Sequence, residues 1–159
     1  MTLTENPGVG GRNQQFVLQC ALELDRQPEE RLTVLSAGSD GVDGNTQAAG
    51  AIADVTTVAR AHALGYNAEA TLTAFDACPL FTALGDLVVT KSTGQNLRDP
   101  RLLIAETSET RQGHAYTILC DVETRLRPTL SMRALGSDRR TIPSLANIIF
   151  HHRVKKAAR

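Results

Sequence analysis

Apolar residues recur at two different spacings along the first 105 residues of the chain. Between residues 16 and 24 they fall at intervals of three and four, which predicts an amphipathic helix, and Asn13 is a suitable N-cap for it. The segment LTVLSA, residues 32–37, is a short apolar run that ends at a glycine loop and is typical of a strand. A helix followed by a strand favours a layered α/β arrangement over a bundle of helices.

The pattern continues as further helices and strands. An Ala-rich helix is expected from about Gln47 to Leu64, with Thr46 as its cap and Gly65 at its end. The remaining elements are short: an extended segment over 2–5, helices over 67–75 and 80–84, and strands over 86–90 and 101–105. The predicted fold class is therefore α/β, a small layered sheet flanked by helices.

The composition is that of an ordinary globular protein. The chain has 159 residues, of which 42% are hydrophobic, and it carries 17 basic and 17 acidic side chains. No apolar run approaches the length of about 20 residues that a membrane-spanning helix needs, so we expect no membrane partner. The first residues show no signal-peptide pattern. Cys20, Cys78 and Cys120 form no CxxC pair, which is typical of thiols in a reducing compartment and predicts a cytoplasmic location.

The balanced charge hides an asymmetry between two parts of the chain. Residues 1–105 hold 7 basic and 12 acidic side chains, whereas residues 106–159 hold 10 basic and 5 acidic ones. We therefore divide the chain into an ordered α/β domain, 1–105, and a basic C-terminal extension of uncertain fold, 106–159. Nucleic acid is not an expected partner of this extension, because its only aromatic residues are Tyr116 and Phe150 and no stacking motif is visible.

The first loop with candidate chemistry is GVGGRN, residues 8–13. Glycines such as Gly10 and Gly11 let a ligand approach the backbone, and a helix start favours an anion. Arg12 adds a permanent cation that can bind phosphate or carboxylate with two hydrogen bonds. A plain turn with a solvated arginine is the alternative. The loop lacks the dinucleotide-binding GxGxxG pattern, since Asn13 occupies the third glycine position.

The second loop is GSDGVDG, residues 38–44, which directly follows the apolar strand. Ligands of α/β sheets collect where strands end, and Asp40 and Asp43 could hold Mg²⁺, orient substrate hydroxyls or act as a base. The alternative is that these residues only make turns. The spacing does not fit a calcium-binding EF-hand loop.

The third loop is KSTGQN, residues 91–96, which also follows a strand. The hydroxyls of Ser92 and Thr93, the amide of Asn96 and the backbone of Gly94 could surround phosphate oxygens or a hydroxy acid. It is not a Walker A loop, and Lys91 is a type of residue that is more often solvated than functional. Together the three loops predict one face that binds polyanions.

Three segments in this order and spacing resemble one known family. GGRNQQF, LSAGSDGVDGNTQAAGAI and LGDLVVTKSTGQNLRD resemble the MOFRL domain, the C-terminal domain of the glycerate 2-kinase family, whose members are often labelled hydroxypyruvate reductases. The resemblance covers about residues 2–105. It implies a MOFRL-like α/β fold and a kinase, which is a phosphoryl transferase that uses ATP and a divalent metal such as Mg²⁺ to phosphorylate D-glycerate at its 2-hydroxyl.

The resemblance also implies roles for individual residues. Arg12 matches the arginine of the GGRN motif and is the expected catalytic residue, which would neutralise the transferring phosphate or bind the substrate. No residue of the chain is assigned as a metal ligand. The expected substrate- or phosphate-binding residues are Gly10, Gly11, Asn13, Ser39, Asp40, Asp43, Thr93, Gly94 and Asn96.

The chain departs from the family pattern in several places. Ser39 replaces a threonine, Asn45 replaces a proline, and Lys91 stands at the first glycine of the usual GPTGTN. The family's active site lies between this domain and a larger N-terminal Rossmann-like domain, which this sequence does not contain. We therefore expect a fragment that is inactive alone, with a separately encoded N-terminal kinase domain as a candidate partner. The alternative is a non-catalytic remnant that binds a ligand or partner, its basic tail contacting nucleic acid or another acidic surface.

Overall fold

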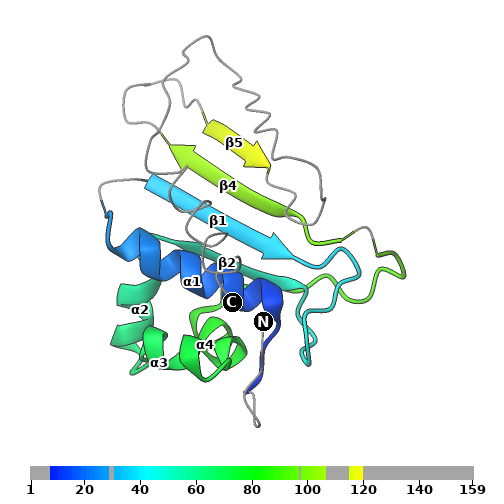
Figure 1. Ribbon diagram of the computed structural model, residues 1–159, viewed down its shortest axis with the longest axis horizontal. Helices are drawn as coiled ribbons and strands as arrows, with labels where there is room; N and C mark the ends of the chain where they lie inside the picture. Colours follow the sequence, from blue (N-terminus) through cyan, green and yellow to red (C-terminus); the bar gives the residue numbers. More distant parts are fainter. Residues whose placement is uncertain (1–7, 29–30, 97, 107–114, 120–159) are drawn as a thin grey trace, which may run out of the picture.

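The computed structural model of the chain describes residues 8–28, 31–96, 98–106 and 115–119, and within them four helices accompany a five-stranded sheet (Figure 1). The predicted α/β class is confirmed. The elements, in chain order, are α1 Arg12–Asp25, β1 Arg31–Ala37, β2 Gly50–Asp54, α2 Thr57–Ala63, α3 Ala68–Thr73, α4 Ala77–Leu84, β3 Leu87–Val88, β4 Arg101–Glu106 and β5 Ala115–Leu119.

The sheet is antiparallel between all neighbouring strands, in the order β3-β2-β1-β4-β5. Strand β1 lies at its centre. It pairs with β2 from Thr33↔Asp54 to Ala37↔Gly50 and with β4 from Arg31↔Glu106 to Ser36↔Arg101. The end of β1, the start of β2 and the start of β4 therefore meet at one end of the sheet, which is where the loops with candidate chemistry emerge.

Helix α1 packs against β1 and β2 and forms the centre of the hydrophobic core. Its interior positions are fully buried, and alternate residues of β1 are buried beneath it because successive side chains of a strand point to opposite faces. Helix α4 adds Leu80 and Phe81 to this core, and both are fully buried. Figure 1 shows α2, α3 and α4 gathered beside α1, away from β4 and β5. The large core residues of α1 and β1 are Val17, Leu18, Leu22, Leu24, Leu32 and Val34.

The predicted Ala-rich helix over 47–64 is wrong. Residues 50–54 form strand β2, and only residues 57–63 are helical. The alanines of β2 are buried between β1, β3 and helix α1, and this packing outweighs the helical preference of alanine. Thr46 consequently caps no helix. It lies in the loop before β2, where its hydroxyl contacts the carbonyls of Asp43 and Ala48.

Other boundaries also differ from the prediction. Helix α1 begins at Arg12, with Gly11 as its N-cap, so Asn13 lies within the helix. Helix α3 is confirmed, and its predicted start is capped by Asn67, whose side chain accepts a hydrogen bond from the backbone N–H of Ala70. Helix α4 starts three residues earlier than predicted, and β3 has two residues where five were expected. The extended segment predicted at 2–5 lies outside the described residues.

The basic extension contributes one described element. Strand β5 pairs with β4 from Leu102↔Leu119 to Glu106↔Ala115, so the sheet continues past the predicted division at residue 105. Residues 107–114 and 120–159 lie outside the described part, and so does the predicted contact of the basic tail with an acidic partner. Among the helices of the described ranges, none is long and apolar enough to cross a bilayer.

Candidate functional site

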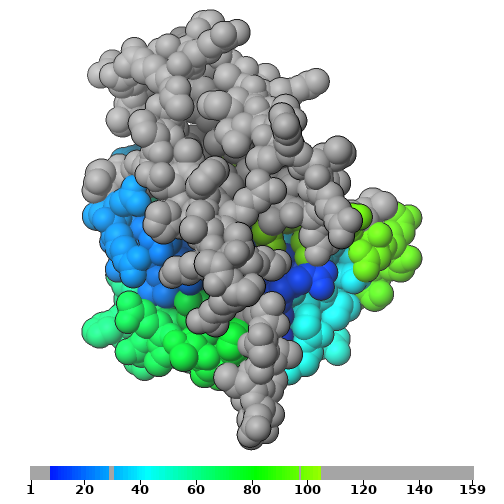
Figure 2. All heavy atoms as spheres, viewed as in Figure 1, coloured from blue at the N-terminus to red at the C-terminus, as the bar shows by residue number. Residues whose placement is uncertain are grey.

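The three loops predicted to carry chemistry meet beside the N-terminus of α1. Figure 2 shows the start of α1 in blue, the loop after β1 in cyan and the segment before β4 in yellow-green, side by side on one flank. Hydrogen bonds join the first loop to the second through Asn13 and Asp43, and the second to the third through Asp40 and Thr93. The structure therefore brings together three segments, residues 8–13, 38–44 and 91–96, that are far apart along the chain.

Asp43 caps helix α1 from a distant loop. Its Oδ1 accepts the backbone N–H of Asn13 (3.0 Å) and its Oδ2 accepts the backbone N–H of Gln14 (2.9 Å). These are donors of the first helical turn, which have no partner within the helix itself. A Cβ on Gly11 would lie 2.2 Å from the carboxyl carbon of Asp43, so only glycine allows this approach. The N-terminus of α1, which could attract the anion of a ligand, is therefore already occupied by the carboxylate of Asp43.

The Asp43 carboxyl group is also buried. The residue is 1% exposed, and this burial raises its pKa above the ordinary value of 3.8, although the bonds from Gln14 and Asn13 oppose the shift. Both of its oxygens accept hydrogen bonds from within the domain. Its contacts are therefore those of a group that stabilises the start of α1.

Asn13 is the centre of a buried polar network. Its Nδ2 donates to Oδ1 of Asp43 (3.2 Å) and to Oδ1 of Asp99 (3.2 Å), while its Oδ1 accepts a hydrogen bond from the hydroxyl of Ser36 (2.5 Å). The Ser36 hydroxyl in turn accepts from Nε of Arg101 (3.3 Å). Asn13 and Ser36 are fully buried. The asparagine of GGRN thus links the first loop, strand β1 and the two carboxylates from inside the domain.

Arg12 points out of this network and forms a bidentate ion pair with Asp99. Its Nε and Nη2 donate to the two carboxylate oxygens, the second bond measuring 2.9 Å. The Arg12 side chain is 60% exposed, whereas that of Asp99 is 8% exposed. The bonds from Arg12 hold the pKa of Asp99 below its ordinary value of 3.8. A buried carboxylate therefore anchors a guanidinium group that lies at the surface.

Asp99 was not among the predicted site residues. The signal available in the sequence was its place in the third motif segment, three residues after Asn96 and directly before Pro100. An aspartate before a proline is also a common turn residue, so the pattern alone did not separate the two interpretations. Only the folded chain places it against Arg12, 87 positions away.

Hydrogen bonds join the second and third loops to each other. The Thr93 hydroxyl donates to the carbonyl of Ser39 (2.6 Å), and its backbone N–H donates to the carbonyl of Asp40 (3.0 Å). The amide of Asn96 donates to Oδ2 of Asp40 (3.4 Å). Gly41 has a φ of +85°, and a Cβ there would lie 1.9 Å from the carbonyl oxygen of Lys91. Because the first loop is also bonded to the second, the three loops together form the rim at the start of α1.

The predicted site residues therefore divide by exposure. Asn13 and Asp43 are buried, and Thr93 lies at the surface but uses its hydroxyl between the loops. The backbone N–H of Gly10 donates to the side chain of Asn45 (2.9 Å), which stands where the family pattern has proline. The members with accessible surface at the rim are Gly10, Gly11, Arg12, Ser39, Asp40, Thr93, Gly94 and Asn96.

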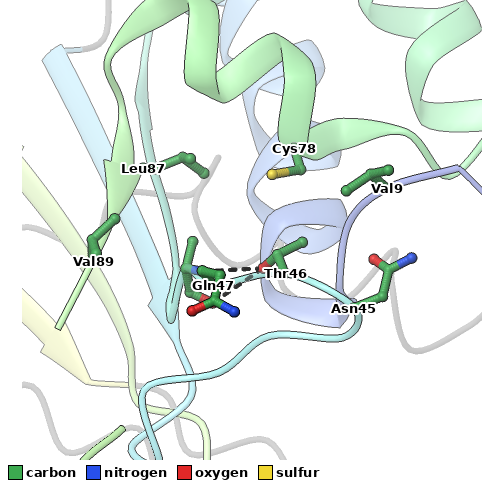
Figure 3. Close-up of a pocket in the computed structure, with 8 residues that line it drawn as sticks. Val9, Asn45, Thr46, Gln47, Cys78, Leu87 and Val89 are labelled. Carbon is green, nitrogen blue, oxygen red and sulfur yellow. Dashed lines mark hydrogen bonds between the residues drawn. The ribbon is translucent and has the colours of Figure 1, made fainter. Parts of the chain in front are cut away.

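A pocket of about 370 Å³ lies beside the loop before β2 (Figure 3). Its lining is mainly apolar, with Val9, Leu87 and Val89 drawn around it and Cys78 above. None of the predicted site residues lines it. The pocket is formed by Val9, Asn45, Thr46, Gln47, Ala48, Cys78, Leu87 and Val89.

A metal cage is not found among the described residues, which contain no group of three His, Cys, Asp or Glu side chains suited to one ion. Asp40 and Asp43 were considered as groups that could hold Mg²⁺, orient hydroxyls or act as a base, and Asp43 has both oxygens bonded inside the domain. Asp40 accepts hydrogen bonds from the backbone of Val42 (3.1 Å) and from Asn96. Mg²⁺ is commonly held by one or two carboxylates together with substrate phosphates and water. The donor set seen in these residues does not amount to a resident metal site.

The fold and the loops define an α/β domain in which glycine-rich turns surround one anchored arginine. Residues 1–99 match the MOFRL family, and the chain belongs to that family. This confirms the resemblance carried by the three motif segments.

The chain is also similar to proteins named as glycerate kinases. It is 38% identical over 92 residues to the D-glycerate 2-kinase of Thermotoga maritima, which covers 58% of this chain and 22% of that protein. Against the glycerate kinase of Homo sapiens it is 38% identical over 104 residues, covering 62% and 20% of the two chains. The crystal structure of glycerate kinase from Thermotoga maritima matches with a TM-score of 0.59 and 34% identity, over 65% of this chain and 24% of that one. The chain thus spans about a fifth to a quarter of these relatives.

Proposed function

We propose that this chain forms one wall of the active site of a D-glycerate 2-kinase, which transfers the γ-phosphoryl group of ATP to the 2-hydroxyl of D-glycerate. The observation that carries the proposal is the Arg12 guanidinium, anchored by Asp99 at the junction of the three loops. Membership of the MOFRL family and the names of the relatives support the choice of reaction.

Arg12 is the proposed catalytic residue. Phosphoryl transfer develops charge on the transferring group, and an arginine that is already in position stabilises that charge without having to reorganise. The guanidinium group has two edges with N–H donors, and Asp99 uses the edge formed by Nε and Nη2. We assign the guanidinium group to the phosphoryl or carboxylate oxygens of the reactants.

The other predicted residues receive two kinds of role. Asp40 and Asn96, with the backbone of Gly94, are proposed to contact the hydroxyl groups and anionic oxygens of the substrate, because they stand at the exposed rim. The remaining predicted residues are proposed to shape the rim, since their hydrogen bonds or close contacts join the loops: Gly10, Gly11, Asn13, Ser39, Asp43 and Thr93.

The proposal requires groups from outside this chain. In-line phosphoryl transfer depends on holding donor and acceptor from several sides, and the described residues form only one of them. ATP and its Mg²⁺ would be held chiefly by a nucleotide-binding domain, either elsewhere in a longer protein or as a separate partner. We therefore expect the 159-residue chain to bind anions weakly at Arg12 and to show no kinase turnover by itself.

A chimaeric enzyme tests the proposal. The segment of the Thermotoga maritima D-glycerate 2-kinase that matches this chain is replaced by residues 8–106, and ADP formation with D-glycerate is followed. We expect turnover that depends on both substrates, with none from the 159-residue chain alone. A folded chimaera without turnover would contradict the proposed reaction, and turnover by the isolated chain would contradict its dependence on a second domain.

A further inference from the structure

We propose that Asp99 is a positioning residue for Arg12, which fixes the place and the plane of the guanidinium that is to bind an anion. The inference deepens the proposed function and rests on the role given there to Arg12. Asp99 itself would not touch the substrate.

The carboxylate of Asp99 is held from the inside of the domain. Its Oδ1 accepts from the buried amide of Asn13 (3.2 Å), which is itself bonded to Ser36 and Asp43. The Asp99 side chain is 8% exposed. The buried network therefore holds this carboxylate independently of its bonds to Arg12.

The arginine, in contrast, is positioned by the carboxylate. Arg12 is the first residue of α1, its side chain is 60% exposed, and an exposed arginine ordinarily samples many rotamers. Two parallel hydrogen bonds to one carboxylate fix both the place and the plane of the guanidinium. This pair gives the guanidinium a defined orientation before any ligand arrives, which lowers the entropy cost of binding one.

The charge of Asp99 and its geometry predict opposite effects on anion binding. If the carboxylate acted only by its charge, it would weaken the attraction of Arg12 for an anion, and its neutralisation would tighten binding. If it acts by positioning, any change that breaks the bidentate pair weakens binding, including one that keeps the charge. Asp99→Glu keeps the charge and moves the carboxylate by one methylene, while Asp99→Asn removes the charge, so the two variants separate these effects.

A second bidentate pair in the same chain supplies a matched control. On helix α2, Arg60 donates through Nη1 (3.2 Å) and Nη2 (2.6 Å) to Asp86, at the end of the molecule that carries none of the three loops. Asp86→Asn makes the same chemical change to the same kind of pair. It is expected to leave binding at Arg12 unaltered.

The experiment titrates the full 159-residue chain with inorganic phosphate and follows the arginine Nε–H signals by NMR, assigning Arg12 by the loss of its signal in Arg12→Lys. In the wild type we expect a slowly exchanging Nε–H signal that phosphate shifts. Asp99→Asn and Asp99→Glu should both lose the slow exchange and bind phosphate about tenfold more weakly, whereas Asp86→Asn should match the wild type.

Two results would overturn the inference. Wild-type affinity in Asp99→Glu, or tighter binding in Asp99→Asn, would show that Asp99 acts through its charge or not at all. A wild-type signal of Arg12 that already exchanges as fast as those of solvated arginines would show that the guanidinium is not fixed, and this readout needs no variant to fold. If the wild type and the Asp86→Asn control bind no phosphate, the proposed anion site fails and the inference fails with it.

Discussion

Two aspartates from different parts of the chain bond to the same amide nitrogen of Asn13, yet their surroundings are opposite. Asp43, from the loop after β1, accepts hydrogen bonds from two backbone N–H groups of α1 and is buried. Asp99, from the segment before β4, accepts hydrogen bonds from the guanidinium of Arg12, which lies at the surface. Burial raises the pKa of Asp43, and Arg12 lowers the pKa of Asp99.

The comparison shows how the same residue type can hold a helix in one region and a cation in another. The carboxylate charge of Asp43 is compensated by the N-terminal end of a helix, where the backbone dipoles favour a negative charge. That of Asp99 is compensated by a side chain. We therefore expect loss of Asp43 to affect mainly the stability of the domain and loss of the Arg12–Asp99 pair to affect mainly its chemistry.

The largest effect on turnover is expected when the cation of the pair, Arg12, is removed. In the chimaeric enzyme, Arg12→Ala should lower turnover by at least about a hundredfold, because it removes a positioned charge from the transition state. Arg60→Ala removes a paired arginine of similar kind and should change turnover by less than about threefold. A fall of less than about threefold for Arg12→Ala would contradict its catalytic assignment.

The two carboxylates should differ in what they contribute to stability. Asp43→Ala leaves two buried N–H groups of α1 without their partner and should lower the free energy of unfolding by about 2–3 kcal/mol. Asp99→Ala should cost about 1 kcal/mol, since the exposed Arg12 regains water. Urea unfolding of the full chain measures both. Equal losses would show that Asp43 is no more important to the helix than Asp99.

The opposite pKa shifts predict an order of protonation on acidification. Asp43, with a folded pKa above 3.8, should protonate before Asp99. The part of its stabilisation that is linked to protonation is largest below 3.8 and is lost as the pH rises through its raised pKa, while its hydrogen bonds to α1 remain. Asp99 should protonate last; it contributes stability above 3.8, which is lost as the pH falls through its lowered pKa. Side-chain carboxyl ¹³C shifts recorded against pH would reveal the order. The reverse order would contradict the assigned surroundings.

The smallest effect is expected in the third loop. Lys91 has a φ of +62°, a left-handed conformation that glycine adopts without strain, and the family pattern has glycine there. Lys91→Gly should therefore raise the stability of the domain by up to about 1 kcal/mol. Lys91→Ala is the control, because alanine removes the charge but keeps the Cβ. Stabilisation of equal size in both variants would assign the effect to the charge.

Much of the fold followed from local patterns. The spacing of apolar residues predicted helix α1 and strand β1, because one face of each is buried against the other. The spacing gave the wrong prediction over residues 47–64, because an alanine-rich sequence is compatible with a helix. The pairing of β2 with β1 cannot be predicted from local spacing.

The sequence predicted the three loops of the candidate site but not the hydrogen bonds between its residues. The glycines and polar residues marked three segments, and the resemblance to the MOFRL family singled out Arg12. The pattern could not reveal that Asn13 and Asp43 bond to each other, since they are 30 residues apart and each is also a common turn or cap residue. Asp99 was missed for the same reason.

The sequence by itself thus determined the family, the α/β class and the arginine at the start of α1, because these depend on residue types and on short spacings. Only the tertiary structure decided which polar residues face inward. A buried polar side chain must find its partners within the fold, and those partners come from segments that meet only after β1, β2 and β4 have paired. The separate roles of Asp43 and Asp99 follow from that pairing.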